Sequence, residues 1–179
     1  MDHQVILPFK KLRNKSVLYA LISHPKYLFW LMNLKPNNKK FGWMKANKFA
    51  HIYAQIQWVI EKLEHLQPVI CPHCGQGFAT TVLLRETSEQ DWYLLDDTYT
   101  HCCSSPNCTG WKLGLTSFNL DWRSAATMNG PQNILKAWLR TRGFQGNLTP
   151  DNLFSFLKNP PVPVSFEPLT KQLQWNWAV

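Results

Sequence analysis

The sequence is poor in acidic residues and lacks the motifs that mark several common enzyme classes. Only 11 of its 179 residues are Asp or Glu, and none of them form the spaced carboxylate pair that holds a nuclease's metal ions. The chain has no G-x-S-x-G, no P-loop and no glycine-rich dinucleotide turn. It also lacks the H-x-E that precedes P-C-x-x-C in zinc deaminases. These absences predict a protein that is not an enzyme.

Long hydrophobic runs are also missing. A membrane-spanning helix needs roughly 18–20 apolar residues in succession. The nearest candidate, residues 17–34, is interrupted by His24, Pro25 and Lys26. The first residues lack the basic-then-apolar order of a secretory signal. We therefore expect a soluble, cytoplasmic protein without a membrane partner. In that compartment, closely spaced cysteines bind metal more often than they form disulfides.

Positive charge is abundant and concentrated in the first third of the chain. Residues 1–66 carry eleven Lys and Arg against three acids, a net charge of +8. This equals the formal net charge of the whole protein. Such a local excess is typical of proteins that bind an anionic polymer, and nucleic acid is the commonest one. We expect nucleic acid as the partner, with DNA preferred over RNA.

Four of the five cysteines form two closely spaced pairs. "CPHCG" places Cys71 and Cys74 on one tight turn, and the second pair ends at Cys108. Its first member is either Cys102 or Cys103. Neighbouring residues of a strand point to opposite faces, so only one of these two cysteines can face a metal ion easily. Cys103 leaves the shorter turn, "SSPN", which has suitable turn residues.

The expected ligands of a Zn²⁺ ion are therefore Cys71, Cys74, Cys103 and Cys108. Cys102 is then a buried, inert thiol. His73 and His101 are rival ligands, but a lone histidine beside a cysteine pair is more often a bystander. Four cysteine ligands leave no open position for water, which favours a structural site over a catalytic one.

The cysteine spacing, C-x2-C, 28 residues and then C-x4-C, resembles the zinc finger of phage Ogr/Delta-type activators. The matching residues are Cys71, Pro72, Cys74, Gly75, Cys103, Asn107 and Cys108. The resemblance covers about a quarter of the chain. It implies a zinc-ribbon fold and bound zinc, and it does not by itself imply transcriptional activation.

A second motif, "LPFKKLRNKSVLYALISHPKYLFWLM", resembles the small C-terminal domain of exodeoxyribonuclease X. The matching residues are Pro8, Phe9, Lys11, Arg13, Lys15, Tyr27, Leu28, Trp30 and Leu31. The chain departs from the family pattern where Lys10 and Asn14 stand in place of glycines. Asn14 tolerates the left-handed backbone conformation that such a position often requires.

This motif places a basic turn against an aromatic helix. The turn residues expected to bind phosphate are Lys10, Lys11, Arg13 and Lys15, and the basic region is extended by Lys39, Lys40, Lys45 and Lys48. Lysines supply charge but no base-edge specificity. We expect Tyr27, Phe29 and Trp30 to hold the turn from the core, with a base stacked on an exposed ring.

The expected fold is α+β, with three successive segments. Residues 1–67 form a basic hairpin–helix unit, and residues 68–120 form a small β-rich zinc ribbon. Residues 121–179 form a helical C-terminal part with a proline-rich tail. The clearest helix covers residues 47–66, with Asn47 as its cap and apolar residues at three- and four-residue spacing. In the last part, Thr149 is expected to cap a helix that begins with Pro150.

These features predict a non-catalytic zinc-ribbon protein that binds nucleic acid as an accessory subunit of a larger nucleoprotein complex. A prokaryote, phage or mobile element is the expected source. One alternative is a protein-interaction adaptor that uses an acidic ribbon and the tail tryptophans. Its residues would be Glu86, Glu89, Asp91, Asp96, Asp97, Trp175 and Trp177. A further alternative is a small metal-dependent nuclease.

Overall fold

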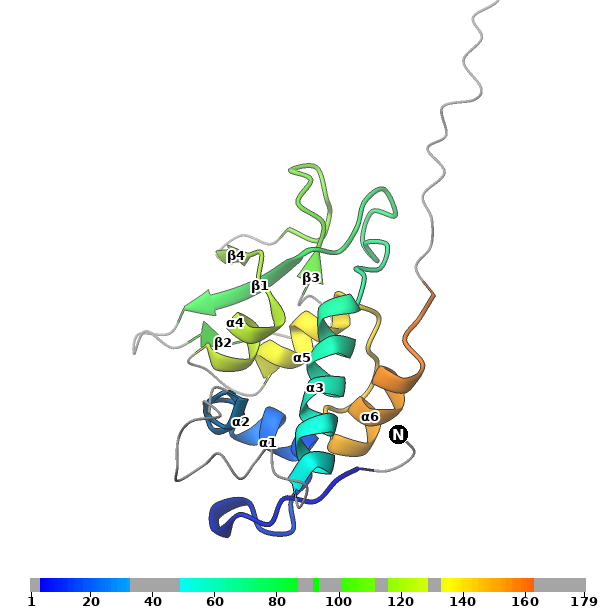
Figure 1. Ribbon diagram of the computed structural model, residues 1–179. Helices are drawn as coiled ribbons and strands as arrows, with labels where there is room; N and C mark the ends of the chain where they lie inside the picture. Colours follow the sequence, from blue (N-terminus) through cyan, green and yellow to red (C-terminus); the bar gives the residue numbers. More distant parts are fainter. Residues whose placement is uncertain are drawn as a thin grey trace, which may run out of the picture.

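The protein has a mixed α+β fold in which helices gather around one core and a short sheet covers them at one end (Figure 1). The computed structural model describes residues 4–32, 49–86, 92–93, 101–111, 116–128 and 133–162. The helices are η1 (Lys10–Leu12, 3₁₀), α1 (Val17–Ser23), α2 (Pro25–Met32), α3 (Ala50–His65), α4 (Trp122–Thr127), α5 (Asn133–Arg140) and α6 (Pro150–Lys158). The strands are β1 (Thr81–Glu86), β2 (Trp92–Tyr93), β3 (His101–Cys102) and β4 (Thr116–Phe118).

Strand β1 organises the sheet, because each of the other three strands pairs with it in antiparallel orientation. Val82 pairs with His101 of β3 and also with Phe118 of β4, so β1 lies between these two strands. Strand β2 pairs with the end of β1, at Arg85 and Glu86. The β-rich character expected after residue 68 is thus present as four short strands among the residues that the structure describes.

The two faces of β1 belong to two different hydrophobic clusters. Val82 and Leu84 join the main core, which also contains buried residues from α1 to α6. Leu83, between them, joins a small cluster with four cysteines. This division follows from the strand geometry, since successive side chains point to opposite faces. One face of the sheet therefore packs on the helical core, and the other face packs on the cysteine-containing loops.

Side chains cap the N-termini of α1 and α6, and the cap of α6 is the one predicted from the sequence. Ser16 caps α1 by accepting a hydrogen bond from the N–H of Tyr19 at 3.1 Å. Thr149 caps α6 through the N–H of Asn152 at 3.2 Å, and Pro150 occupies the first helical position. Such caps satisfy backbone N–H groups that have no partner inside the helix.

Two helices differ from the sequence-based expectation. Helix α3 begins at Ala50, and its N-cap is Phe49, which provides no side-chain hydrogen bond. The predicted cap, Asn47, lies outside the described residues. The predicted apolar stripe is otherwise buried, and its packing compensates for the missing cap. Helix α4 was not predicted. Its six residues are too few to show a helical periodicity of apolar residues. The sequence feature that marks its start is the N-cap Asp121, whose carboxylate accepts a hydrogen bond from the N–H of Ser124 at 2.6 Å.

Other expectations concern residues outside the described ranges. These are Lys39, Lys40, Lys45, Lys48, Glu89, Asp91, Asp96, Asp97, Trp175 and Trp177. Residues from all three predicted segments, such as Leu7, Val82 and Leu153, contribute to the main core. Within the described ranges, every helix is too short or too polar to cross a membrane.

Candidate metal centre and basic turn

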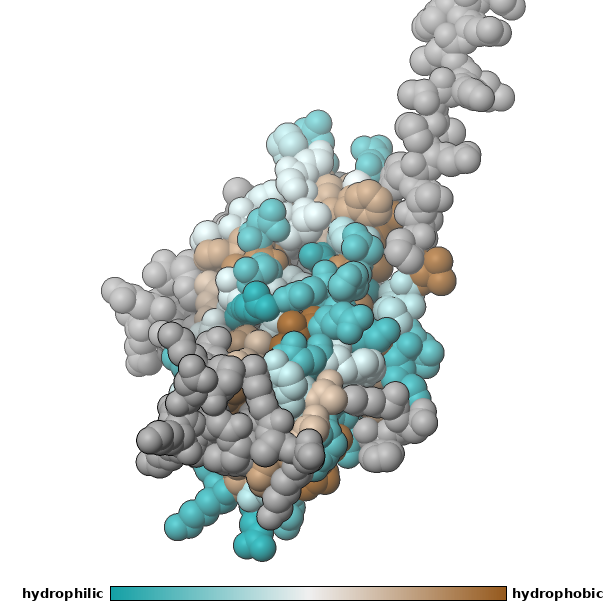
Figure 2. Space-filling view, viewed as in Figure 1, coloured by the Kyte–Doolittle hydropathy of each residue, from teal (hydrophilic) through white to brown (hydrophobic). Residues whose placement is uncertain are grey.

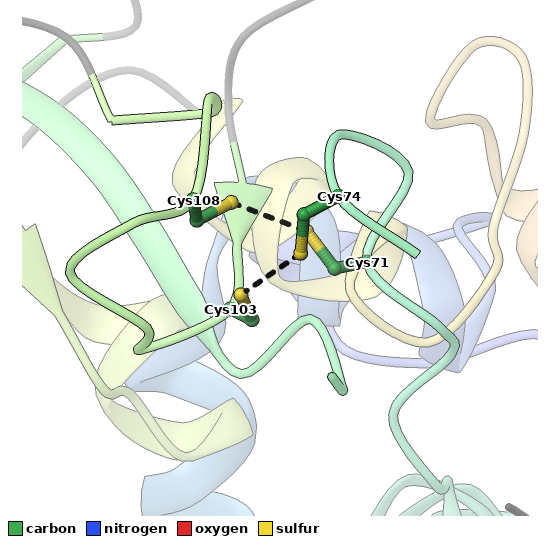
Figure 3. A group of neighbouring side chains, drawn as sticks. All are labelled: Cys71, Cys74, Cys103 and Cys108. Carbon is green, nitrogen blue, oxygen red and sulfur yellow. Dashed lines mark hydrogen bonds between the residues drawn. The ribbon is translucent and has the colours of Figure 1, made fainter. Parts of the chain in front are cut away.

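Four cysteine side chains from two loops point toward a common centre (Figure 3). All four sulfurs lie within 4.8 Å of one another. The Sγ atoms of Cys71 and Cys108 are 3.6 Å apart, and those of Cys74 and Cys103 are 3.4 Å apart. Each of these close pairs joins one loop to the other. The structure therefore brings together the four residues that the spacing predicts as metal ligands, with Cys103 and not Cys102 in the group.

The first loop is a tight turn whose backbone is fixed by hydrogen bonds. The N–H of Gly75 donates to the carbonyl oxygen of Cys71 at 3.0 Å, and the N–H of Cys71 donates to that of Gly77 at 2.6 Å. Gly75 has a φ of 66°, a left-handed conformation that glycine adopts without steric cost. This turn places Cys71 and Cys74 side by side with their sulfurs directed to the centre.

The second loop is closed by a backbone bond and a tryptophan. The N–H of Cys108 donates to the carbonyl oxygen of Ser105 at 3.0 Å. The same oxygen accepts from the indole Nε1–H of Trp111 at 2.8 Å. The N–H of Gly110 lies 3.4 Å from the sulfur of Cys108. Backbone N–H groups directed at cysteine sulfur stabilise the thiolate form that binds metal.

The two loops contact each other beyond the cysteines. The hydroxyl of Thr109 donates to the carbonyl oxygen of His73 at 3.0 Å. A Cβ added to Gly110 would lie 2.5 Å from the His73 ring and 2.8 Å from the Cβ of Cys102. Only a residue without a side chain fits between these groups. Gly110 was not singled out from the sequence, because nothing local distinguishes it from an ordinary turn glycine.

Local hydrogen bonds favour the thiolate of Cys71. Burial by itself raises the pKa of this thiol, but the backbone N–H groups of His73, Cys74 and Cys103 and the thiol of Cys108 lower it to about 7. Cys71 therefore ionises more readily than an ordinary cysteine.

Cys102 and Cys103 respond mainly to burial. Removal from water, together with the charges of the neighbouring cysteines, raises the pKa of Cys102 to about 12. Burial likewise raises the pKa of Cys103 to about 12. Cys102 is not one of the four converging cysteines and stays a neutral thiol, fully buried in the same small cluster as Leu83. Cys103 lies within the group, so a bound cation is required to hold it as a thiolate.

The cysteine group fits a tetrahedral metal ion. With a metal–sulfur distance of about 2.3 Å, the sulfurs of a tetrahedral site lie about 3.8 Å apart. The sulfur–sulfur distances of 3.4 Å for Cys74–Cys103 and 3.6 Å for Cys71–Cys108 are close to this value. They are far longer than the roughly 2.05 Å of a disulfide bond, and all five cysteines are free. The four thiol groups could thus hold one metal ion in a closed site.

The basic turn at the other end of the molecule is a well-braced structure. The N–H of Leu7 donates to the carbonyl oxygen of Lys15 at 2.8 Å, and the N–H of Asn14 donates to that of Leu7 at 3.2 Å. Asn14 has a φ of 63°, the left-handed conformation expected from the sequence. Leu12 is almost completely buried and fixes η1 to the core. The turn therefore has a defined shape.

The turn exposes four cations, Lys10, Lys11, Arg13 and Lys15. In the described part of the chain the one ion pair joins Arg123 to Glu64, so no acidic side chain there neutralises the turn. The turn borders a surface hollow of about 460 Å³, lined by Ile6, Leu7, Pro8, Lys10, Arg13 and Asn14. Hydrophilic side chains project from this end of the molecule (Figure 2).

The aromatic helix behind the turn only partly matches the expectation. The ring of Tyr27 contacts Phe9 edge-on, with centroids 6.5 Å apart, and so supports the turn as predicted. Phe29 instead packs against Trp122 at 5.4 Å, which places it under α4. Trp30 is 42% exposed and is therefore not a core residue. The sequence pattern could not separate these roles, since all three rings lie within four residues.

No protein-family model matches the chain, and neither a curated protein nor a solved structure shows significant similarity to it. The cysteine group and the basic turn are therefore the features of the molecule that indicate its function.

Proposed function

We propose that the protein is a non-catalytic, zinc-stabilised nucleic-acid-binding protein. The zinc assignment is supported by the four converging thiols, because a tetrahedral all-sulfur site is typical of zinc or iron, and zinc carries no redox chemistry. The site is closed, so its role is to hold two loops together. The zinc-ribbon resemblance of residues 71–108 agrees with this assignment.

The observation that carries the nucleic-acid assignment is the rigid turn with four exposed cations. A phosphate backbone is bound by several Lys and Arg side chains on one surface, and counterion release drives the association. Because the turn is braced by backbone hydrogen bonds, these cations are held close together before binding. Binding then orders less of the protein, which favours affinity. We place DNA before RNA as the ligand, in a larger nucleoprotein complex.

The test is fluorescence anisotropy of the metal-loaded protein with labelled DNA and RNA across a salt series. We expect a Kd that weakens as salt rises. Each lost phosphate contact should reduce the slope of log K against log salt by about 0.7–0.9. A Lys10→Ala/Lys11→Ala variant should therefore bind more weakly and show a shallower salt slope.

The matched control is Lys62→Ala/Lys158→Ala, which removes the same charge from α3 and α6. It should bind almost as well as the wild type. Equal weakening in both variants would show that only net charge matters and would reject the turn as the binding surface. The same complexes, incubated with Mg²⁺ or Mn²⁺, should contain full-length DNA. Cleavage that depends on a side chain of this protein would reject the non-catalytic assignment.

A further inference from the structure

Helix α2 carries a row of aromatic rings that begins at the basic turn and ends at the surface. Phe9, which immediately precedes η1, contacts Tyr27 with centroids 6.5 Å apart. Tyr27 contacts Trp30 with centroids 5.4 Å apart. The three rings thus form a continuous path from the cations of the turn to an indole that is 42% exposed.

The position of Trp30 on the helix supports a role in binding. The neighbouring positions Leu28 and Leu31 are buried and fix α2 to the core, so the orientation of the helix is set. Lys26, one turn before Trp30, is exposed. Residues four apart are neighbours on a helix surface, so a cation lies beside the exposed indole. Trp30 therefore has Lys26 as its neighbour on α2 and is joined to the turn through Tyr27 and Phe9.

An exposed indole beside cations has a particular use with nucleic acids. Base–aromatic stacking requires a free base face, which single strands offer and duplexes do not, because their bases are already stacked. Cations alone bind both forms through the phosphates. An aromatic ring next to the cations therefore adds affinity for single strands only.

We propose that Trp30 stacks on a base of a single-stranded nucleic acid whose phosphates contact the basic turn, so that single strands are the preferred ligand. This inference rests on the proposed nucleic-acid binding by the turn. Tyr27 supports the indole from behind, and Lys26 contacts a flanking phosphate. Since every base has a π-face, the preference is for strandedness and not for sequence.

The experiment compares a labelled oligo-dT single strand of about 12 nucleotides with a duplex of equal length, using the metal-loaded full chain. Trp30→Ala should weaken single-strand binding by about five- to 150-fold, the range expected for one lost stack. Trp30→Phe should retain most of the affinity. Neither variant should change duplex binding. The control Trp58→Ala removes an indole from α3 that packs on Phe154, and it should leave single-strand binding unchanged.

A second measurement does not depend on the folding of the alanine variant. Single strands should quench a tryptophan emission that is present in the wild type and missing in Trp30→Phe. Unchanged single-strand affinity in Trp30→Ala, or identical quenching in Trp30→Phe, would overturn the inference. If the Trp30 variants behaved in that way but Lys10→Ala/Lys11→Ala bound nucleic acid more weakly than the wild type, only the inference would fall and the proposed function would stand. Absence of binding to either oligonucleotide at low salt would overturn both.

Discussion

The backbone N–H of Val69 donates to the carbonyl oxygen of Thr141 at 2.9 Å, and this bond ties the start of the first cysteine loop to the end of α5. The carbonyl oxygen of Val69 accepts in turn from the N–H of Ala79 at 2.8 Å, on the far side of the loop. Gly143, just past α5, packs closely on the Val69 side chain. Both ends of the loop are therefore anchored to the helical part without help from the cysteines.

Removal of the metal should consequently loosen the loops but not the helices. The small cluster around the cysteines contains Leu83 as its only large fully buried apolar side chain among the described residues, so it is too small to fold alone. After chelation, hydrogen exchange should become fast at the amides of Cys71 and Cys108. The amides of Val69 and Leu153 should stay protected. Uniform loss of protection along the chain would contradict this prediction.

The choice between the two adjacent cysteines can be tested by metal content. Native mass spectrometry should show one zinc ion per chain in the wild type. Cys103→Ser should lose the ion, because the site then lacks one of the four thiolates that hold it. Cys102→Ala should keep it, since this thiol lies outside the ligand group and its Cβ contact with Gly110 is preserved. Loss of metal in both variants, or in neither, would reject the assignment, and bound iron would reject zinc.

A methyl group at Gly110 should destabilise the contact between the loops. Its Cβ would collide with His73 and with the rigid Cβ of Cys102, so Gly110→Ala should cost about 1–3 kcal/mol of unfolding free energy. Gly77→Ala is the matched control in the same module, because its Cβ would lie 3.4 Å from that of Cys103, an ordinary contact. Thermal denaturation of both metal-loaded variants gives the comparison. Equal melting temperatures would show that the loops can separate freely.

The cap of α4 should make a small pH-dependent contribution to stability. The N–H of Ser124 lowers the pKa of Asp121, so folding favours the ionised carboxylate. This contribution is present above the ordinary pKa of 3.8 and is lost as the pH falls through the lower folded value. Asp121→Ala should cost about 1 kcal/mol at neutral pH, and Asp121→Asn should cost less.

Urea denaturation at several pH values checks this cap. The stability difference between the wild type and Asp121→Asn should narrow as the pH falls below about 4. The difference between the Asn and Ala variants should stay constant, because neither residue titrates. If the stability difference between the wild type and Asp121→Asn did not depend on pH, the charge of the carboxylate would not contribute to the cap.

The features that could be predicted from the sequence are those with a short, local cause. The spacing of Cys71 and Cys74 around a tight turn, the left-handed Asn14 and the Thr149 cap each depend on a few adjacent residues. The preference for Cys103 over Cys102 followed from the alternation of a strand. In each case the residues of one turn or cap determine its local geometry. Packing against distant segments does not alter that geometry.

The features that were missed depend on contacts between distant segments. Position 110 must be glycine because His73 of the other loop lies against it. Phe29 packs against Trp122 and not against the basic turn. Trp30 shares its local pattern with buried neighbours, and only the packed fold distinguishes its exposure. Helix α4 depends on docking of Trp122 into the core. Contacts between such distant segments leave no periodic pattern in the sequence.

The alternation along β1 means that two properties of this protein can change independently of each other. A substitution at Val82 or Leu84 alters the helical core and hence global stability, whereas one at Leu83 alters the support behind the cysteines and hence metal affinity. Evolution or a protein engineer could therefore tune the metal dependence of the loops through a single position while the rest of the molecule keeps its folding behaviour. A shift of one residue in the register of this strand would exchange the side chains on its two faces. It would damage the helical core and the support behind the cysteines at once.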